Sequence, residues 1–229
     1  MKKILIFVIL MLPGYLIIAQ DPARFSNEIQ SFHKLDKNSL PPAGCILFTG
    51  SSSIRFWKTL ENDFRDFCVI NRGFGGSEIS DVNYYFDQVV SSYKPQIVVL
   101  YAGENDLTSG ELPENVFKDF KKFLDKITSL PDKIPVIYIS AKPSPLRWRL
   151  KDSCLKLNSL IREYCSTKEN VIFVDIFDDM LGSNGRPIPE LYIQDSLHMS
   201  GKGYELWQKK ITPYLSKYYD RNKTGFHKK

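Results

Sequence analysis

The sequence predicts an α/β fold, a three-layer α/β/α sandwich around a central five-stranded parallel sheet. Five short runs of residues are apolar at almost every position, as in strands that helices cover on both faces. Segments with apolar residues at helical spacing separate these runs, and alternating strands and helices build parallel sheets through right-handed crossovers. A chain of 229 residues is long enough for one such domain.

The strands are expected in the apolar runs. These runs read CILFTG, VINRG, IVVLYAG, VIYISA and VIFVDIF, at residues 45–50, 69–73, 97–103, 136–141 and 171–177. Helices are expected where apolar residues recur every three or four positions. The three stripes of this kind are Ile79, Val82, Phe86, Val89 and Tyr93; Phe117, Phe120, Phe123, Leu124 and Ile127; and Leu150, Cys154, Leu157, Ile161 and Tyr164.

Two further helices are expected at the ends of the domain. The first would cover the core with Phe25, Ile29 and Phe32. The last would use Tyr204, Trp207 and Ile211. We expect this last helix to end or bend near Pro213, because proline lacks a backbone N–H and clashes with the preceding turn.

The N-terminal segment 1–20 is interpreted as a signal peptide. Two lysines precede a nearly unbroken apolar run and the small residue Ala19, which is the layout of a secretory signal. We expect cleavage near Ala19 or Gln20, export to the periplasm or beyond, and no stable membrane insertion afterwards. An uncleaved anchor is the alternative, because the run approaches the length of a bilayer span; Pro13 and Gly14 disfavour it.

The net charge of +5 does not indicate an acidic partner. Six of the basic residues lie in segments 1–20 and 221–229, which contain no acid, and the remaining chain has 25 basic against 26 acidic residues. Nucleic-acid binding therefore has no basic surface to rest on. We expect one domain over residues 21–220, followed by a basic tail at 221–229.

Four cysteines in an exported chain raise the question of pairing. Cys154 and Cys165 are eleven residues apart on one helical face, which is too far for a bond within that helix. We interpret the four cysteines as buried free thiols. A bridge between Cys45 and Cys68, which begin two neighbouring strands, is the alternative.

Polar segments follow the expected strands, and in a parallel sheet the carboxyl ends of the strands form one edge where sites lie. These segments are GSSSIR, GFGGSE, GENDLTSG, KPSPLRW and the stretch leading to IQDSLHMSGKGY. We expect all five to meet at this edge.

A serine in GSSSIRFW could act as a nucleophile if a base and an orienting acid were available. Of the three histidines, His33 falls on the first helix and His227 in the tail, which leaves His198, three residues after Asp195. An N-terminal capping turn with an exposed histidine is the alternative for this Asp-x-x-His pattern. Ser52 is expected at the start of a helix through Phe56, Trp57 and Leu60 that adds positive potential, with its two neighbouring serines capping the turn.

Two segments offer donors for a developing oxyanion. NRGFGG, residues 71–76, presents backbone N–H groups after the second strand, and GEND, residues 103–106, places Asn105 after the third. Either could be merely a turn. An α/β-hydrolase elbow is disfavoured, because Gly50-Ser51-Ser52-Ser53-Ile54 lacks the final glycine of Gly-x-Ser-x-Gly.

Together these segments resemble the blocks of the SGNH hydrolases, also called GDSL esterases and lipases. The resemblance runs from about Gly44 to Trp207 and implies a flavodoxin-like SGNH hydrolase fold for the domain at 21–220. It implies an acyl-enzyme mechanism with no metal or cofactor. The implied catalytic residues are Ser52, Asp195 and His198, and the implied oxyanion hole is formed by Ser52, Gly76 and Asn105.

One residue departs from the family pattern. The first block normally has Asp after its glycine, where this chain has Ser51. Aligning Gly50 and Trp57 with the block selects Ser52 as the nucleophile, and the neighbouring serines Ser51 and Ser53 are the alternatives. The missing Asp is also the only support for the alternative that the chain is a non-catalytic glycan-binding protein.

The resemblance favours a small-molecule or glycan ester as substrate, most of all short acyl (acetyl) esters on carbohydrates. A lysophospholipase or other lipid-ester hydrolase is the alternative enzyme. Arg55, Arg147 and Trp148 are candidates for a polar or stacking wall against a sugar, and packing or ion pairing is their alternative role.

Overall fold

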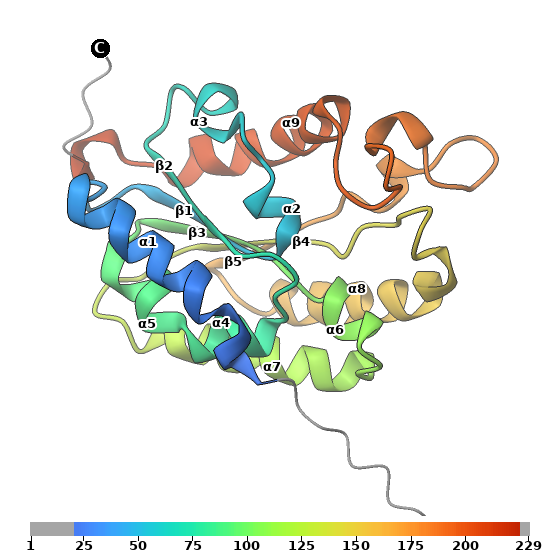
Figure 1. Ribbon diagram of the computed structural model, residues 1–229, viewed down its shortest axis with the longest axis horizontal. Coiled ribbons are helices and arrows are strands. Elements are labelled where there is room, and N and C mark those ends of the chain that lie inside the picture. The colour runs from blue at the N-terminus through green and yellow to red at the C-terminus, as the bar shows by residue number, and fades with distance from the viewer. Residues whose placement is uncertain (1–20, 225–229) are drawn as a thin grey trace, which may run out of the picture.

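The computed structural model describes residues 21–224 and contains the expected sheet (Figure 1). All neighbouring strands pair in parallel, in the order β2-β1-β3-β4-β5. The strands are β1 (Ile46–Gly50), β2 (Val69–Gly73), β3 (Ile97–Tyr101), β4 (Val136–Ile139) and β5 (Val171–Val174). The predicted fold class is confirmed, and each strand lies within its predicted run. The signal peptide expected at 1–20 lies outside the described residues.

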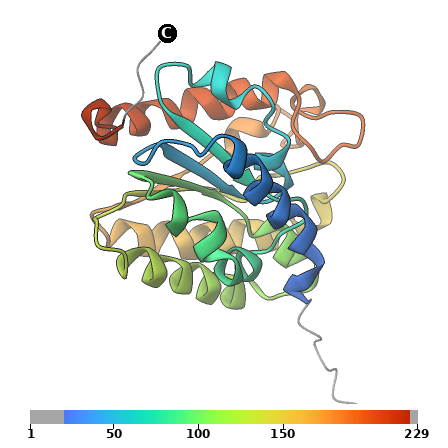
Figure 2. The ribbon, with the colours of Figure 1, turned by 60° about the vertical axis from the view of Figure 1, so that its left-hand side comes forward.

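Helices cover both faces of the sheet, as Figures 1 and 2 show. The helices are α1 (Ser26–Asn38), α2 (Ser52–Arg55), α3 (Leu60–Asp63), α4 (Ile79–Tyr84), α5 (Phe86–Val89), α6 (Glu104–Thr108), α7 (Pro113–Thr128), α8 (Lys151–Ser166) and α9 (Gly201–Tyr218). One core contains the buried faces of α1, α4, α5, α7 and α8, and the other contains those of α2, α3 and α9. Along β1, Leu47 points into the first core and Phe48 into the second, because successive side chains of a strand alternate.

Three helices differ from the expectations. The stripe at 79–93 is buried as predicted but is divided among α4, α5 and a short 3-10 helix, Ser91–Tyr93. The helix expected from Ser52 through Leu60 is a single turn, α2, followed by the separate α3. Of the two outcomes expected at Pro213, an end is excluded: α9 continues to Tyr218, with Ile211 and Leu215 fully buried on either side of the proline.

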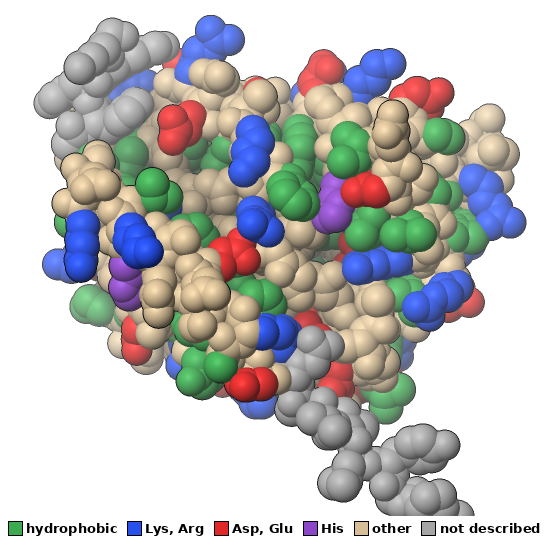
Figure 3. Space-filling model, in the orientation of Figure 1, with side chains coloured by type: hydrophobic (Ala, Val, Ile, Leu, Met, Phe, Trp, Pro, Cys, Tyr) green, Lys and Arg blue, Asp and Glu red, His purple; other side chains and the backbone are tan. Residues whose placement is uncertain are grey.

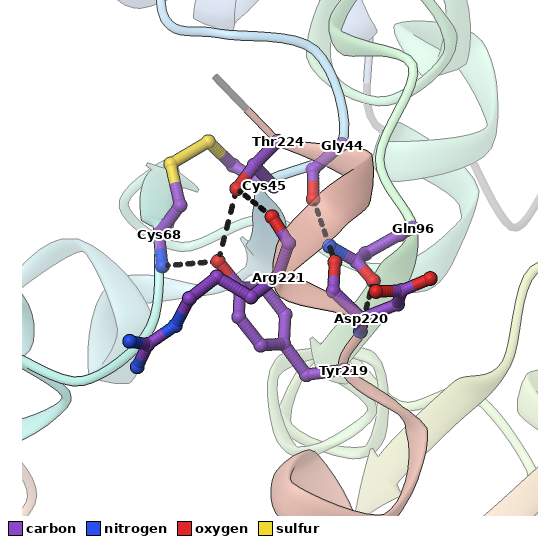
Figure 4. Close-up of a disulfide and its surroundings, with 8 residues drawn as sticks. All are labelled: Gly44, Cys45, Cys68, Gln96, Tyr219, Asp220, Arg221 and Thr224. Atoms are coloured by element: carbon purple, nitrogen blue, oxygen red, sulfur yellow. Dashed lines mark hydrogen bonds between the residues drawn. A yellow bond between two sulfur atoms is a disulfide. The ribbon is translucent and has the colours of Figure 1, made fainter. Parts of the chain in front are cut away.

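The preferred interpretation of Cys45 and Cys68 was wrong, since these residues form a disulfide (Figure 4). The pairing of β1 with β2 matches Ile46 with Val69, so the cysteines immediately before them are neighbours with their Cα atoms 4.7 Å apart. That separation lies within the range of disulfides. Cys154 and Cys165 are buried free thiols, as expected.

The chain beyond α9 packs beside the disulfide, against the residues that precede β1, β2 and β3 at the amino ends of the strands. Tyr219 accepts the backbone N–H of Cys68 with its hydroxyl oxygen, and Gln96 bonds the backbone of both Gly44 and Asp220. A 3-10 helix, Arg221–Lys223, follows. The first residues of the expected basic tail therefore belong to the packed domain, and residues 225–229 lie outside the described part of the chain (Figure 4).

We predict that the double substitution Cys45→Ser, Cys68→Ser lowers the free energy of unfolding by about 3 kcal/mol, the amount expected from closing a loop of this length. The two cysteines are 23 residues apart. Urea unfolding of the double variant and of the wild type, the latter with and without a reductant, measures the change. Cys154→Ala is the control: it removes a free thiol, so it should not reproduce the effect of reduction. A denatured, unreduced protein with four titratable thiols would contradict the bridge.

Candidate active site

The turn after β1 holds Ser52 at the carboxyl edge of the sheet. Gly50 has φ +117°, and a Cβ there would lie 2.0 Å from the carbonyl oxygen of Tyr101, so only glycine fits. The N–H of Ser51 donates to the same oxygen at 2.8 Å. Ser52 is half-buried, whereas Ser51 and Ser53 are buried. Contrary to expectation, the side chain of Ser51 does not cap α2, and a four-residue helix contributes little macrodipole.

His198 connects Ser52 to Asp195. Its Nε2 lies 2.9 Å from Ser52 Oγ, and its Nδ1 lies 2.6 Å from Asp195 Oδ2. Ser52 and His198 are 146 residues apart in the sequence. Figure 3 shows a histidine beside acidic and hydrophobic side chains on the face that carries α2 and the start of α9. The arrangement is that of a nucleophile, a base and a group that orients the base.

The loop from Asp195 to His198 is a tight turn that is closed by its own carboxylate. Asp195 Oδ1 accepts the N–H groups of Leu197 and His198, each at 2.9 Å, and Ser196 adopts a positive φ of 58°. The cap of α9 is Ser200, which accepts the N–H of Gly203. The capping role considered for the Asp-x-x-His pattern therefore belongs to another residue.

These contacts keep Asp195 ionised. Partial burial raises its pKa, but the hydrogen bonds from the His198 ring and from the N–H groups of His198 and Leu197 outweigh burial and lower the pKa to about 2. The carboxylate therefore remains negative at any pH near neutrality. It can hold the imidazole in the tautomer that carries a proton on Nδ1, which leaves Nε2 free to accept one from Ser52.

The predicted oxyanion donors lie on two loops of the same edge. Gly76 has φ +79°, and a Cβ there would meet no atom within 4 Å, so the space in front of it is open. Its loop is held by the bond from Phe74 N–H to the Gly50 carbonyl and by Glu28, whose oxygens lie 3.2 and 3.3 Å from Gly75 N. Asn105 donates from Nδ2 to the carbonyl of Ser77 at 2.9 Å.

The three residues predicted to bind substrate have protein partners. Arg55 Nε lies 2.7 Å from Glu28 Oε1, and Arg147 Nη1 donates to Asn105 Oδ1 at 3.0 Å. The Trp148 ring lies under the cations of two neighbours, Lys151 and Arg186. Arg55 also borders a groove of about 710 Å³ between α1 and the segment of α2 and α3. Substrate contacts of these three residues stay a prediction.

Sequence reasoning missed three charged residues at the site. Glu104 and Lys142 lie within the segments GEND and KPSPLRW, but nothing in those segments indicated that the two side chains pair at 2.5 Å. Glu28 lies on α1, outside every motif, and nothing distinguishes it from the other charged residues of that largely polar helix. Among residues 21–224, no cluster of three or more His, Cys, Asp or Glu side chains could hold a metal ion.

Asp106, the residue after Asn105, connects α6 to the start of α4. Its Oδ1 accepts the N–H of Ile79 at 2.9 Å, and its Oδ2 has no hydrogen-bond partner among the described residues. Complete burial raises its pKa from 3.8 to about 8. The carboxyl group is therefore protonated at neutral pH in the folded protein.

Comparison with known proteins places the chain in a family. Residues 48–206 match the model of the GDSL-like Lipase/Acylhydrolase family, and the chain belongs to this family of ester hydrolases. The structure of a GDSL-like lipase from Bacteroides thetaiotaomicron is similar, with 25% identity, a TM-score of 0.67, and 86% of this chain and 98% of that chain covered.

A second similar structure is that of a protein from Bacteroides fragilis that is described as an acylhydrolase. It is 23% identical, with a TM-score of 0.72, and the alignment covers 88% of this chain and all of that chain. No curated protein shows significant similarity to the chain. Within residues 21–224, no helix is both long and apolar enough to cross a bilayer.

We predict that Asp106→Asn raises the free energy of unfolding relative to wild type, by an amount that grows with pH. Between pH 3.8 and about 8 the unfolded wild type has lost this proton while the folded protein retains it, so the wild type loses stability as pH rises through this window. Urea unfolding of both proteins at pH 4.5, 6 and 8 measures the difference. A difference that is independent of pH would contradict the raised pKa of Asp106.

Proposed function

We propose that this protein is a serine esterase that hydrolyses carboxylic esters through an acyl-enzyme on Ser52. The observation that carries the proposal is the continuous hydrogen-bonded chain from Ser52 Oγ through the His198 ring to Asp195. It lies at the carboxyl edge of the sheet, in a chain of the GDSL-like family. A serine hydroxyl becomes a useful nucleophile only with such a base beside it.

In the proposed mechanism, Ser52 Oγ attacks the ester carbonyl while His198 Nε2 takes its proton. His198 then donates that proton to the departing alcohol, which leaves the acyl group on Ser52. A water molecule, deprotonated by the same nitrogen, hydrolyses the acyl-enzyme and regenerates the hydroxyl. Asp195 stays ionised throughout and stabilises the imidazolium that forms in each step.

The negative charge on the attacked oxygen requires donors at a fixed place. In this proposal they are the N–H groups of Ser52 and Gly76 and the side-chain amide of Asn105. No described residue accepts the N–H of Gly76, and the space beside that residue is open, which leaves this donor for a ligand.

We propose short acyl (acetyl) esters, carried on a carbohydrate, as the substrate class. The groove beside Arg55 supports this choice: Ser52 and His198 do not line it, but Arg55 lies on α2 with Ser52. Its lining combines charged and amide side chains with aromatic ones and so suits a polyhydroxylated leaving group. Export through segment 1–20 is part of the same proposal. The Cys45–Cys68 bridge supports export, because disulfides persist in oxidising compartments.

A lipid ester is the second candidate substrate, and a specific observation favours it. Three exposed apolar side chains adjoin the catalytic loops: Phe56, 39% exposed, with its ring 4.7 Å from that of His198; Leu146, 60% exposed; and Ile193, 51% exposed. Leu146 and Ile193 bond the backbone of Ser196 and His198, respectively. Such a rim would contact an acyl chain.

We predict that Ser52→Ala and His198→Ala each lower kcat/KM for p-nitrophenyl acetate by at least about 10⁴-fold, because either change removes the nucleophile–base pair. Ser53→Ala is the matched control, since its buried hydroxyl is not bonded to His198. A fluorophosphonate probe should label wild type and Ser53→Ala but not Ser52→Ala. Undiminished hydrolysis in both Ser52→Ala and His198→Ala would reject the mechanism, and a wild type that neither turns over esters nor reacts with the probe would indicate a binding protein.

We predict that kcat/KM is higher for acetylated sugars than for esters of long acyl chains. The measurement is a series of p-nitrophenyl esters from two to sixteen carbons, together with acetylated mono- and oligosaccharides and a lysophospholipid. Phe56→Ala serves as the discriminating variant, because loss of its ring should weaken long-chain hydrolysis selectively. Preference for the lysophospholipid, abolished by Phe56→Ala, would establish the lipid-ester alternative instead.

A further inference from the structure

A buried group of charged side chains lies directly behind Asn105. The carboxylate of Glu104 binds Lys142 Nζ at 2.5 Å through Oε2, and its Oε1 lies 3.3 Å from Arg147 Nη1. The side chains of Glu104 and Lys142 are 5% and 1% exposed, and that of Arg147 is 18% exposed. Because Arg147 Nη1 also donates to Asn105 Oδ1 at 3.0 Å, this arginine joins the buried group to the amide of the candidate oxyanion site.

The group carries one more positive than negative charge. Burial disfavours ionisation of Glu104, but Lys142 and Arg147 outweigh burial and lower the pKa of its carboxyl group. The hydroxyls of Tyr101 and Ser144 complete the hydrogen bonds of this carboxylate without adding charge. Glu104 and Lys142 neutralise each other, so Arg147 is the surplus cation.

A surplus charge that is largely withdrawn from solvent is costly unless a negative charge stands near it at some stage. The acidic groups Asp195 and Glu28 are engaged elsewhere, by His198 and by Arg55 and Gly75. The acceptor that Arg147 reaches besides Glu104 is the Asn105 amide, which is itself a proposed donor to the ester oxygen. The oxygen that becomes negative during ester hydrolysis would therefore lie two hydrogen bonds from the surplus cation, with the Asn105 amide between them.

The contacts also determine which end of the Asn105 amide faces each neighbour. A guanidinium only donates, so it can bind Oδ1 and not Nδ2; the carbonyl of Ser77 only accepts, so it can bind Nδ2 and not Oδ1. A reversed amide would place Nδ2 against the Arg147 donor and Oδ1 against the Ser77 carbonyl, so neither contact could be a hydrogen bond. Arg147 and Ser77 thus hold Asn105 with its NH₂ group on the side away from the arginine.

We propose that Arg147 is a positioning residue of the oxyanion site, which holds the Asn105 amide in its donating orientation and places a positive charge behind it. This inference rests on the proposed esterase function. In this inference, Arg147 helps to stabilise the transition state. The sequence had instead made it a candidate for a wall that contacts a sugar.

The test compares Arg147→Met and Arg147→Lys with wild type on p-nitrophenyl acetate. In Arg147→Met, the Glu104–Lys142 pair remains neutral, so the fold should be retained and melting temperatures should change little. We expect kcat to fall about 10- to 100-fold, the size of one lost hydrogen bond with a charged partner, with KM within about twofold. Arg147→Lys should recover part of the loss, and guanidinium ion added to Arg147→Met should recover part as well.

The matched control is Arg149→Met, which removes an exposed arginine from the same segment and should leave kcat unchanged. Fluorophosphonate titration supplies the concentration of active sites, so that misfolded protein does not count as lost turnover. An alkyl boronic acid, which forms a tetrahedral anion on the serine, should bind Arg147→Met more weakly by the same factor as the loss in kcat/KM.

Two results would overturn the inference while leaving the esterase intact. One is that both kcat and KM are unchanged in Arg147→Met; the other is a raised KM with unchanged kcat, which would make Arg147 a substrate-binding residue. Failure of the esterase proposal itself has a different signature, because hydrolysis would then be absent from wild type or would survive in Ser52→Ala. That result would overturn both proposals.

Discussion

The candidate site depends on the in-register pairing of β1 with its two neighbours. Gly50 pairs with Gly73 of β2 and with Tyr101 of β3, so three strands end at one level and their following loops begin side by side. The backbone of Gly50 touches Tyr101 so closely that no side chain fits between them. A slip by one residue would exchange the two faces of β1 and would move Ser52 away from His198.

Much of this arrangement follows from local sequence. The strands were predictable because they are continuously apolar, and their common edge was predictable because parallel strands share a direction. His198 and the nearby Asp195 were predictable because the chain has only three histidines, whereas Ser52 was selected among three neighbouring serines by the resemblance to the first block of the SGNH hydrolases. The breaks in the helix at 79–93 were not predictable, because the same apolar stripe is buried whether the helix is continuous or divided.

The supporting residues escape sequence reasoning for a different reason. Glu28 contacts Gly75 from 47 positions away, and Glu104 pairs with a lysine 38 positions further on, so neither partner is implied by spacing. The cysteine bridge depends on the register of two strands, which the sequence alone left open. In each case the local pattern identified the element, whereas the contact arose from how two elements were packed.

The disulfide has a further consequence, because residues 45–68 form a covalent ring and Ser52 lies inside it. The same ring includes α2, α3 and the exposed turn between them. A protease that cut the chain once at that turn would leave both new ends attached through the sulfurs. The nucleophile would stay connected to the rest of the enzyme, so a nicked molecule would still be a single covalently linked molecule.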